Sequence, residues 1–167
     1  MSEFQPPDRL DRAILEWLQR DGRATFETLG TRVGLSASAV LRRVHRLEAM
    51  GVIERYAALL RAERLGLGLT AYVQVRLEKQ AAPAAHTPME AFRASVAAWP
   101  EVVECVALAG EVDVLLKLVV PDMAAYSRFM MDALLRHPSV QDCKTGFVID
   151  RIKGPAEIPL SGLGFGN

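Results

Sequence analysis

Residues 33–48 read VGLSASAVLRRVHRLE, and this stretch decides how the first third of the chain is expected to fold. Gly34 is suited to end one helix, and Ser36 is suited to cap the next because its hydroxyl can accept a bond from a free backbone N–H. The apolar side of that second helix consists of Val40, Val44 and Leu47. Two helices joined by a tight Gly-Leu-Ser turn are typical of a helix-turn-helix.

The opposite side of the same helix carries small residues at its start and arginines further along. Small side chains permit close approach to base edges, and arginine can bond guanine or clamp phosphate. On a helical wheel Arg42 and Arg46 fall on this outward half, and Arg43 lies on its flank. A solvated arginine face on a structural helix is the alternative, and the preceding helix and turn favour DNA reading. The predicted DNA-contacting residues are Ser36, Ser38, Ala39, Arg42, Arg43, His45 and Arg46.

Two helices are predicted before this one. Asp8 is suited to cap a helix over residues 10–18, whose apolar positions recur with helical spacing. Thr25 is suited to cap a second helix that continues to Val33. Gly30 is a weak position inside it, because glycine costs about 1 kcal/mol relative to alanine.

The second half of the chain changes period. Alternating, β-branched stretches predict four strands, and two helical stretches lie between them. The strands are expected at Thr70–Leu77, Val102–Ala109, Val112–Val120 and Val140–Ile152, and the helices at Pro88–Trp99 and from Asp122 to Leu134. A tight Gly110-Glu111 turn is expected to join the middle strands into a hairpin. The order β-α-β-β-α-β predicts a ferredoxin-like α/β-sandwich, and the chain as a whole belongs to the α+β class.

These elements imply two domains. Residues 52–60, after the helix-turn-helix, are expected to be extended and to form a small wing. The expected divisions are a DNA-binding domain at 1–60, a linker at 61–69, a ferredoxin-like effector and oligomerisation domain at 70–153, and an irregular tail at 154–167.

The charge of the chain limits how it can contact DNA. It carries 20 Lys and Arg against 20 Asp and Glu, so a basic coat over the whole surface is excluded. The helix over residues 36–49 has three arginines and one glutamate, whereas residues 1–60 have nine basic and eight acidic side chains. Positive charge is therefore concentrated on the helix that is predicted to read DNA.

The sequence gives little support for a membrane protein, a secreted protein or an enzyme. No apolar run reaches the roughly 18 residues of a membrane span, and the acidic start of the chain does not resemble a secretory signal. Cys105 and Cys143 form no paired motif, which favours a reduced, cytoplasmic chain, and Cys105 is expected to be a buried apolar residue. His45, His86 and His137 lack metal-ligand spacing, and the serines have no obvious base partner. We therefore expect no enzyme activity, metal or cofactor.

The chain resembles the leucine-responsive/asparagine-regulator (Lrp/AsnC) transcription factors over about residues 8–153. Order and spacing together carry the resemblance, rather than any single motif. The matching stretches are residues 10–15, 18–23, 33–36, 40–48, 51–53 with Tyr56, 65–68, 100–102, 110–113 and 115–116.

The resemblance implies a homodimer built by the second domain, often assembled further into tetramers or octamers, with an amino acid as effector near the strand hairpin. Gly110 and Asp113 match the family positions there, and ordinary hairpin turn chemistry is the alternative for this pair. Many members have tyrosines where Val112 and Val114 stand here, so the pocket is expected to be more apolar. The expected effector-binding residues are Gly110, Glu111, Val112, Asp113 and Thr145.

Together these observations predict a regulator that binds double-stranded DNA and responds to a small effector. One alternative is an architectural DNA-binding protein, which predicts weakly selective binding without an effector response. A less favoured alternative is a metabolite-binding or enzymatic ferredoxin-like protein, which predicts turnover or metal dependence and no salt-sensitive DNA binding.

Overall fold

The computed structural model describes residues 7–79, 86–154 and 157–161, and the chain divides into two compact units. The first unit combines Met1–Leu59 with Lys153–Asn167, and the second is Leu60–Ile152. Both ends of the chain therefore belong to the same unit.

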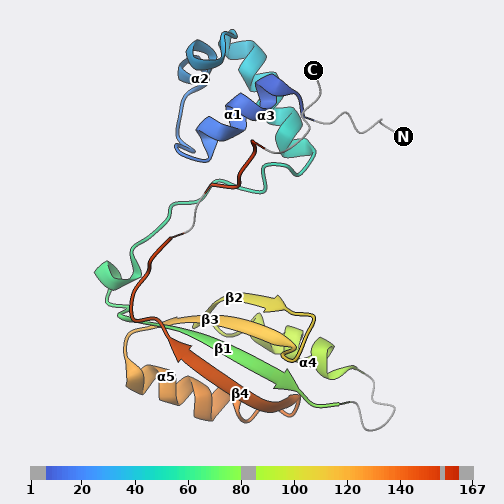
Figure 1. Cartoon of the computed structure of the whole chain (residues 1–167), viewed down its shortest axis with the longest axis vertical. Coiled ribbons are helices and arrows are strands. Elements are labelled where there is room, and N and C mark those ends of the chain that lie inside the picture. The colour runs from blue at the N-terminus through green and yellow to red at the C-terminus, as the bar shows by residue number, and fades with distance from the viewer. Residues whose placement is uncertain (1–6, 80–85, 155–156, 162–167) are drawn as a thin grey trace. The chain divides into compact units, whose positions relative to one another are not determined.

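Three helices make up the first unit (Figure 1). They are α1 (Arg9–Leu18), α2 (Phe26–Val33) and α3 (Ala37–Ala49). Each begins at the predicted cap, because Asp8, Thr25 and Ser36 accept hydrogen bonds from the first backbone N–H groups of their helices. Ile14, Leu29, Val40 and Val44 form the buried core between the helices.

Glycine at position 30 is required by the packing of α2 against the turn that follows it. A Cβ atom built there would lie 2.5 Å from the carbonyl oxygen of Leu35, closer than two such atoms can approach. Gly34 ends the helix with a φ of +72°, a left-handed conformation that glycine adopts readily. Gly30 lowers the helix propensity of α2, but the tight turn between α2 and α3 needs a residue without a Cβ atom at this position.

The predicted wing is not formed in the described chain. Residues 54–61 belong to no helix or strand, and no strand of the first unit's described residues pairs with them. A single extended segment cannot satisfy its own backbone groups, so a wing needs a second strand beside it. The helix-turn-helix itself is as predicted.

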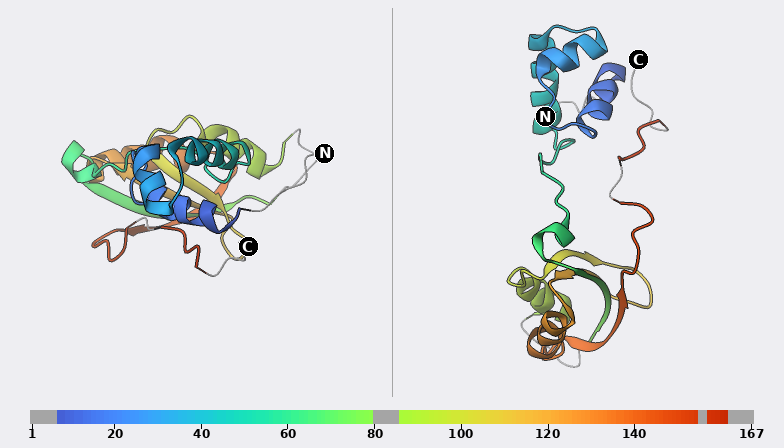
Figure 2. Two further views of the ribbon diagram at one scale, coloured as in Figure 1. Left: turned by 90° about the horizontal axis from the view of Figure 1, so that it is seen from above. Right: turned by 90° about the vertical axis from the view of Figure 1, so that its left-hand side faces the viewer.

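The second unit is a four-stranded antiparallel sheet with helices on one face (Figures 1 and 2). The strands are β1 (Leu69–Leu77), β2 (Val102–Ala107), β3 (Val114–Val120) and β4 (Val140–Phe147), in the order β2-β3-β1-β4. The helices are α4 (Pro88–Val96) and α5 (Met123–Phe129), with the π-helical segment η2 (Met130–Leu134) after α5 and the 3₁₀ turn η1 (Ala62–Leu65) before β1. This is the predicted ferredoxin-like arrangement.

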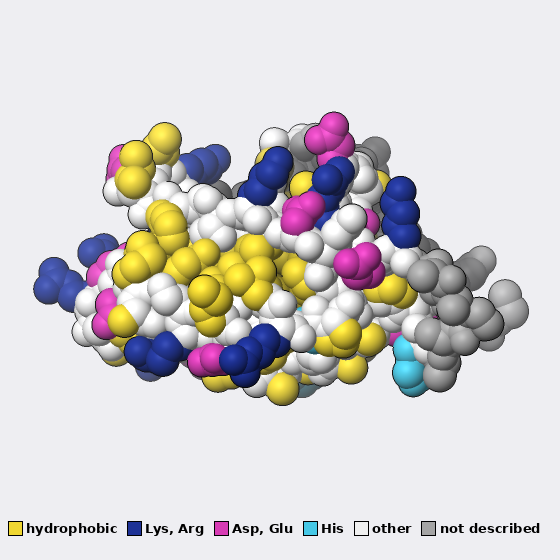
Figure 3. All heavy atoms as spheres, turned by 90° about the horizontal axis from the view of Figure 1, so that it is seen from below, with side chains coloured by type: hydrophobic (Ala, Val, Ile, Leu, Met, Phe, Trp, Pro, Cys, Tyr) yellow, Lys and Arg dark blue, Asp and Glu magenta, His cyan; other side chains and the backbone are white. Residues whose placement is uncertain are grey.

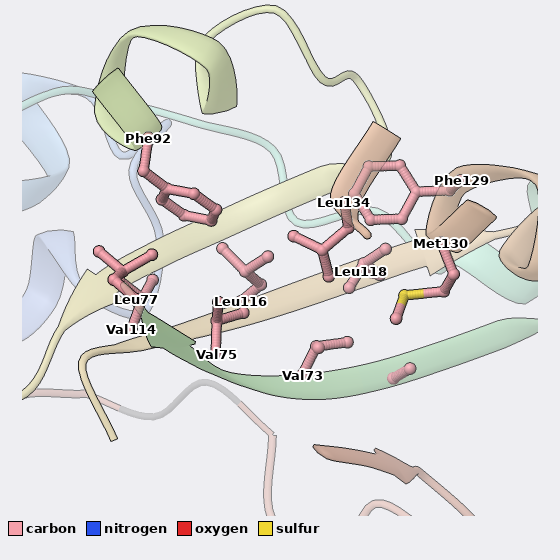
Figure 4. Close-up of a cluster of buried hydrophobic side chains, with 11 residues drawn as sticks. Val73, Val75, Leu77, Phe92, Val114, Leu116, Leu118, Phe129, Met130 and Leu134 are labelled. Atoms are coloured by element: carbon pink, nitrogen blue, oxygen red, sulfur yellow. The ribbon is translucent and has the colours of Figure 1, made fainter. Parts of the chain in front are cut away.

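The core of this unit lies between the sheet and its helices (Figure 4). From Ala71 to Leu77 strand β1 alternates between buried and exposed residues, with Val73 and Val75 buried beneath the helices. Phe92 of α4 and Phe129 of α5 pack onto this apolar face, which Leu116 of β3 continues. The alternating stretch that predicted this strand therefore packs one of its sides into the core.

Several predicted ends differ from the structure. The hairpin is joined by residues 108–113 rather than by a two-residue turn, so β2 ends at Ala107 and β3 begins at Val114. Asp113 closes this connection, because its carboxylate accepts a bond from the N–H of Leu77 at 2.8 Å and its backbone carbonyl accepts one from the N–H of Leu108 at 2.9 Å. The last strand ends at Phe147 and does not extend to Ile152.

Candidate functional site

The outward side of α3 offers a polar, accessible surface. Ser36, Ser38, Arg42 and His45 are exposed, and Ala39 is half-buried. The Ser36 hydroxyl accepts from the N–H of Ala39 at 3.3 Å and lies 3.1 Å from the Ser38 hydroxyl. Arg42 makes no ion pair within the described part of the chain. Its guanidinium is therefore available to an external partner.

The other two arginines of α3 turn back onto α1. The Arg43 Nη1 donates to Asp8 Oδ2 at 2.6 Å and to Asp11 Oδ1 at 2.8 Å, and Arg46 Nη2 donates to Asp11 Oδ2. Asp11 is fully buried, and it also accepts from the N–H of Asp8 in a capping box. We call these four residues the Asp8–Asp11–Arg43–Arg46 network.

Contacts within the network change the pKa values of Asp8 and Arg43. Burial alone would raise the pKa of Asp8, but bonds from the backbone of Asp11 and the side chain of Arg43 outweigh it and hold that pKa below its usual value. Burial alone would lower the pKa of Arg43, and its bonds to Asp8 and Asp11 instead raise it. Both groups therefore stay charged at neutral pH.

The network corrects the helical-wheel prediction for Arg46. That residue was placed on the outward half, yet only 32% of its side chain is exposed and it pairs with Asp11. Arg43, predicted on the flank, has only 25% of its side chain exposed. A signal was present in the sequence: two acids three residues apart at the start of α1 match two arginines three residues apart in α3.

A hollow of about 330 Å³ lies where the N-terminal ends of α2 and α3 meet. Thr25 and Ser38 line it, together with Phe26 and Leu41. Helix N-termini carry partial positive charge and free N–H groups, which suit a phosphate oxygen. The sequence analysis did not anticipate this hollow, although both caps that flank it were predicted.

A groove of about 520 Å³ lies at one end of the sheet in the second unit. It brings together three of the predicted effector residues, Gly110, Glu111 and Asp113, with Arg76 and Lys79 at the end of β1. The remaining lining residues are Leu77, Glu78, Thr87, Pro88, Met89 and Gln141. Carboxylates and basic side chains therefore meet in one groove.

Asp113 is held in place within this groove. Its Oδ2 accepts from the N–H of Leu77 at 2.8 Å, and its own N–H donates to the carbonyl of Val75 at 3.1 Å. Arg76 Nε donates to the carbonyl of Glu111 at 3.0 Å. A carboxylate has more acceptor positions than one backbone bond uses, so Asp113 can still receive a donor from a ligand.

Two predicted effector residues lie elsewhere. Val112 lines a smaller adjoining hollow of about 120 Å³, which shares Arg76 and Glu111 with the groove. Thr145 is opposite Val73 on the helix-covered face of the sheet, and its hydroxyl lies 2.8 Å from that of Tyr126. The expectation that Thr145 neighbours the hairpin residues is corrected, because the β1–β4 register directs it toward α5.

Among the described residues no three His, Cys, Asp or Glu side chains gather in a way that could hold a metal ion. Cys105 is exposed and not buried as expected, because β2 is an edge strand. Cys105 and Cys143 are both free thiols.

A histidine–serine contact in the second unit was missed by the sequence analysis. The His137 Nε2 lies 3.0 Å from the Ser95 hydroxyl, and the ring packs edge-on against Phe92 and Trp99. The N–H of Ser139 donates to His137 Nδ1, so in the neutral ring Nε2 carries the proton. In this tautomer His137 donates toward Ser95, and the Ser95 hydroxyl donates to the carbonyl of Ala91 at 3.2 Å, so the pair is bonded as a structural contact.

Lowering the pH from 7.5 to 5.5 should reduce the free energy of unfolding of the second unit. Burial, only partly offset by a bond with the backbone of Ala91, holds the pKa of His137 below its ordinary value of 6.5. The unfolded chain then takes up the proton first as the pH falls, so stability is complete above about pH 6.5 and declines below it. The variant H137Q should show a smaller fall in melting temperature between the two pH values.

The exposed His86 provides the control, because H86Q should keep the full pH-dependent fall. Equal falls in H137Q and the unaltered chain would contradict the assignment. Asp8, with its lowered pKa, loses its contribution only below about pH 4, outside this window.

Two domain families match the chain and together span most of it. Residues 8–48 match the AsnC-type helix-turn-helix domain, and residues 70–158 match the Lrp/AsnC ligand binding domain. The chain belongs to the Lrp/AsnC family. Its two units therefore correspond to the DNA-binding and ligand-binding parts of a transcriptional regulator.

Relatives of known role support the assignment. The leucine-responsive regulatory protein of Salmonella typhimurium is 42% identical over 146 residues, and that of Escherichia coli K12 is 41% identical, each match covering 87% of both chains. A crystal structure of a Neisseria meningitidis transcriptional regulator in complex with L-Met has a TM-score of 0.85 and 45% identity, covering 92% of this chain and 97% of that one. An AsnC family regulator from Agrobacterium tumefaciens has a TM-score of 0.80 and 37% identity, with the same coverage.

These relatives are Lrp/AsnC transcriptional regulators, and the helix-turn-helix of this member is a DNA-binding domain. Among the described residues, none of the helices combines the length and apolar character that a membrane crossing requires.

Proposed function

We propose that this Lrp/AsnC protein is a cytoplasmic regulator without catalytic activity, and that it binds double-stranded DNA through the outward side of α3. Its DNA affinity changes when an amino acid occupies the groove beside Asp113. The observation that carries the proposal is the meeting of opposite charges in that groove. A free amino acid has an ammonium group that suits Glu111 and Asp113, and a carboxylate that suits Arg76 and Lys79.

The side chains at the start of α3 support the DNA-binding part of the proposal. The small residues Ser38 and Ala39 lie at the start of α3, where close approach to base edges is possible. Arg42, one turn further on, is exposed and forms no ion pair with the residues that the structure describes. Arg43 and Arg46, which the sequence analysis assigned to DNA contact, serve in this proposal to hold α3 against α1.

Homodimers, which assemble further to tetramers or octamers, form part of the proposal. Apolar side chains gather in a broad band across the face shown in Figure 3, with charged side chains along its edges. The second unit leaves large apolar side chains exposed on strands and helices, including Tyr72, Val103, Val106, Met131, Leu135 and Phe147. Exposed large apolar side chains favour association with another chain.

The decisive experiment measures DNA affinity by fluorescence anisotropy in the presence of each of the twenty amino acids. The duplex is one selected by the protein from a random pool. We expect one amino acid, or a few related ones, to change the Kd by roughly five-fold or more, the usual size of allosteric coupling. The variant D113N should lose this response and keep the ligand-free Kd, because asparagine still offers an oxygen to the N–H of Leu77.

The exposed carboxylate Asp132 serves as the control, so D132N should retain the full response. A protein that binds the duplex equally well with every amino acid would be an architectural DNA-binding protein. A response that persists in D113N would place the effector site elsewhere.

A further inference from the structure

The last described residues of the chain lie against the DNA-binding unit. The side-chain amide of Gln19, at the C-terminal end of α1, holds the backbone of Ile158 from both sides. Its Oε1 accepts the Ile158 N–H at 2.6 Å, and its Nε2 donates to the Ile158 carbonyl at 3.3 Å. Two bonds from one planar amide fix both the position and the direction of the tail segment.

An ion pair beside this contact restricts which segment of chain can lie there. The Arg20 Nε donates to both oxygens of Glu157, at 3.2 and 3.1 Å. The two side chains are 56% and 44% exposed, so solvent screens the pair and its contribution to stability is small. Its main effect is on which segment can lie there, since a basic residue in place of Glu157 would meet Arg20 directly.

An apolar groove continues from these polar contacts. It has a volume of about 360 Å³ and lies between α1 and the chain that follows α3. Leu15, Leu18 and Ile53 provide its wall, and Ile158 and Leu160 enter from the tail. Leu160 is half-buried there, whereas Ile158 remains largely exposed. The tail residue two positions beyond the Gln19 contact therefore supplies most of the apolar burial.

We propose that this groove is a docking site for the chain's own segment Glu157–Leu160, and that the docked segment is a second tether on the DNA-binding unit. The first tether is the linker after Leu59, and the chain enters the DNA-binding unit again at Lys153. Nine residues lie between Phe147, the end of β4, and Glu157, so the connection spans at most about 35 Å. A DNA-binding unit held at both points has less freedom to reorient than one on a single linker.

Hydrogen exchange of the full-length protein tests the docking directly and requires neither DNA nor an effector, so its outcome is separate from that of the proposed function. The Ile158 amide should exchange slowly because it is bonded to Gln19. In Q19A, which removes both bonds, exchange at Ile158 should accelerate by roughly tenfold or more. Exchange at an unprotected rate in the unaltered protein, or an unchanged rate in Q19A, would overturn the proposal.

Charge reversal distinguishes the chain's own tail from that of a second copy. R20E and E157R each place like charges together and should speed exchange at Ile158, and the double variant R20E/E157R should restore slow exchange. A mixture of the two single-variant chains, allowed to form mixed assemblies, should not be restored. The double variant would be restored whether the tail docks within one chain or on a second copy, so the mixture decides. Restoration in the mixture would mean that the tail of another copy occupies the groove, which contradicts docking within one chain.

Discussion

Replacing Arg42 by alanine should weaken binding to a selected duplex by roughly five- to hundred-fold, the range of one lost arginine–base or arginine–phosphate contact. Arg42 is exposed on α3, and no acidic partner within the described residues neutralises it. Nothing in the fold depends on its side chain, so the melting temperature of R42A should stay close to that of the unaltered protein. Fluorescence anisotropy at two salt concentrations measures the affinity and its salt dependence.

Two further variants show what kind of contact Arg42 makes. R42K keeps the charge but not the planar fork, so it should recover affinity if the partner is a phosphate and fail to do so if the partner is a guanine edge. R93A, on α4 of the second unit, removes an equivalent exposed charge and should leave DNA affinity unchanged. An R42A protein that binds as tightly as R93A would show that α3 does not read DNA through this side.

Replacing Asp11 by asparagine should destabilise the DNA-binding unit by about 3–5 kcal/mol, the usual cost of removing one partner from a buried charge cluster. Asp11 is fully buried and receives bonds from both Arg43 and Arg46. Without its charge, Arg43 and Arg46 would both lose the buried carboxylate that they bond at the α1–α3 contact. Hydrogen exchange of α1 and α3 reports the loss separately from the second unit.

A matched surface pair provides the comparison for Asp11. Arg12 and Glu16 are four residues apart on α1, and their side chains are 33% and 37% exposed. E16Q should therefore cost less than about 1 kcal/mol. If D11N and E16Q were equally stable, the network could not be what fixes α3 against α1.

Local signals in the sequence were sufficient to predict most of the fold. Asp8, Thr25 and Ser36 were each predicted as helix caps, and each accepts a hydrogen bond from a backbone N–H at a helix start. Caps and apolar periodicity act over three or four residues, so a single sequence contains them. The order of these elements predicted the arrangement of the sheet, because the order β-α-β-β-α-β is typical of the ferredoxin-like fold.

The candidate site was harder to predict because it depends on contacts between elements. A helical wheel gives the direction of Arg46 but not which neighbouring helix lies in that direction, and α1 supplies Asp11 there. Thr145 was placed on the correct strand, yet its face depends on the register with β1, which no local pattern determines. The residues of the effector groove that were predicted successfully, Gly110, Glu111 and Asp113, share one short loop.

The division of the chain has a consequence for engineering hybrid regulators. Fusing residues 1–59 alone to a foreign sensor would transfer α1, α2 and α3 but leave behind the segment that Gln19 binds through its side-chain amide. Leu15 and Leu18 would then border an unfilled apolar groove. The complete DNA-binding unit therefore comes from two separate segments of the sequence. A hybrid with a single fusion junction would lack the C-terminal segment of that unit.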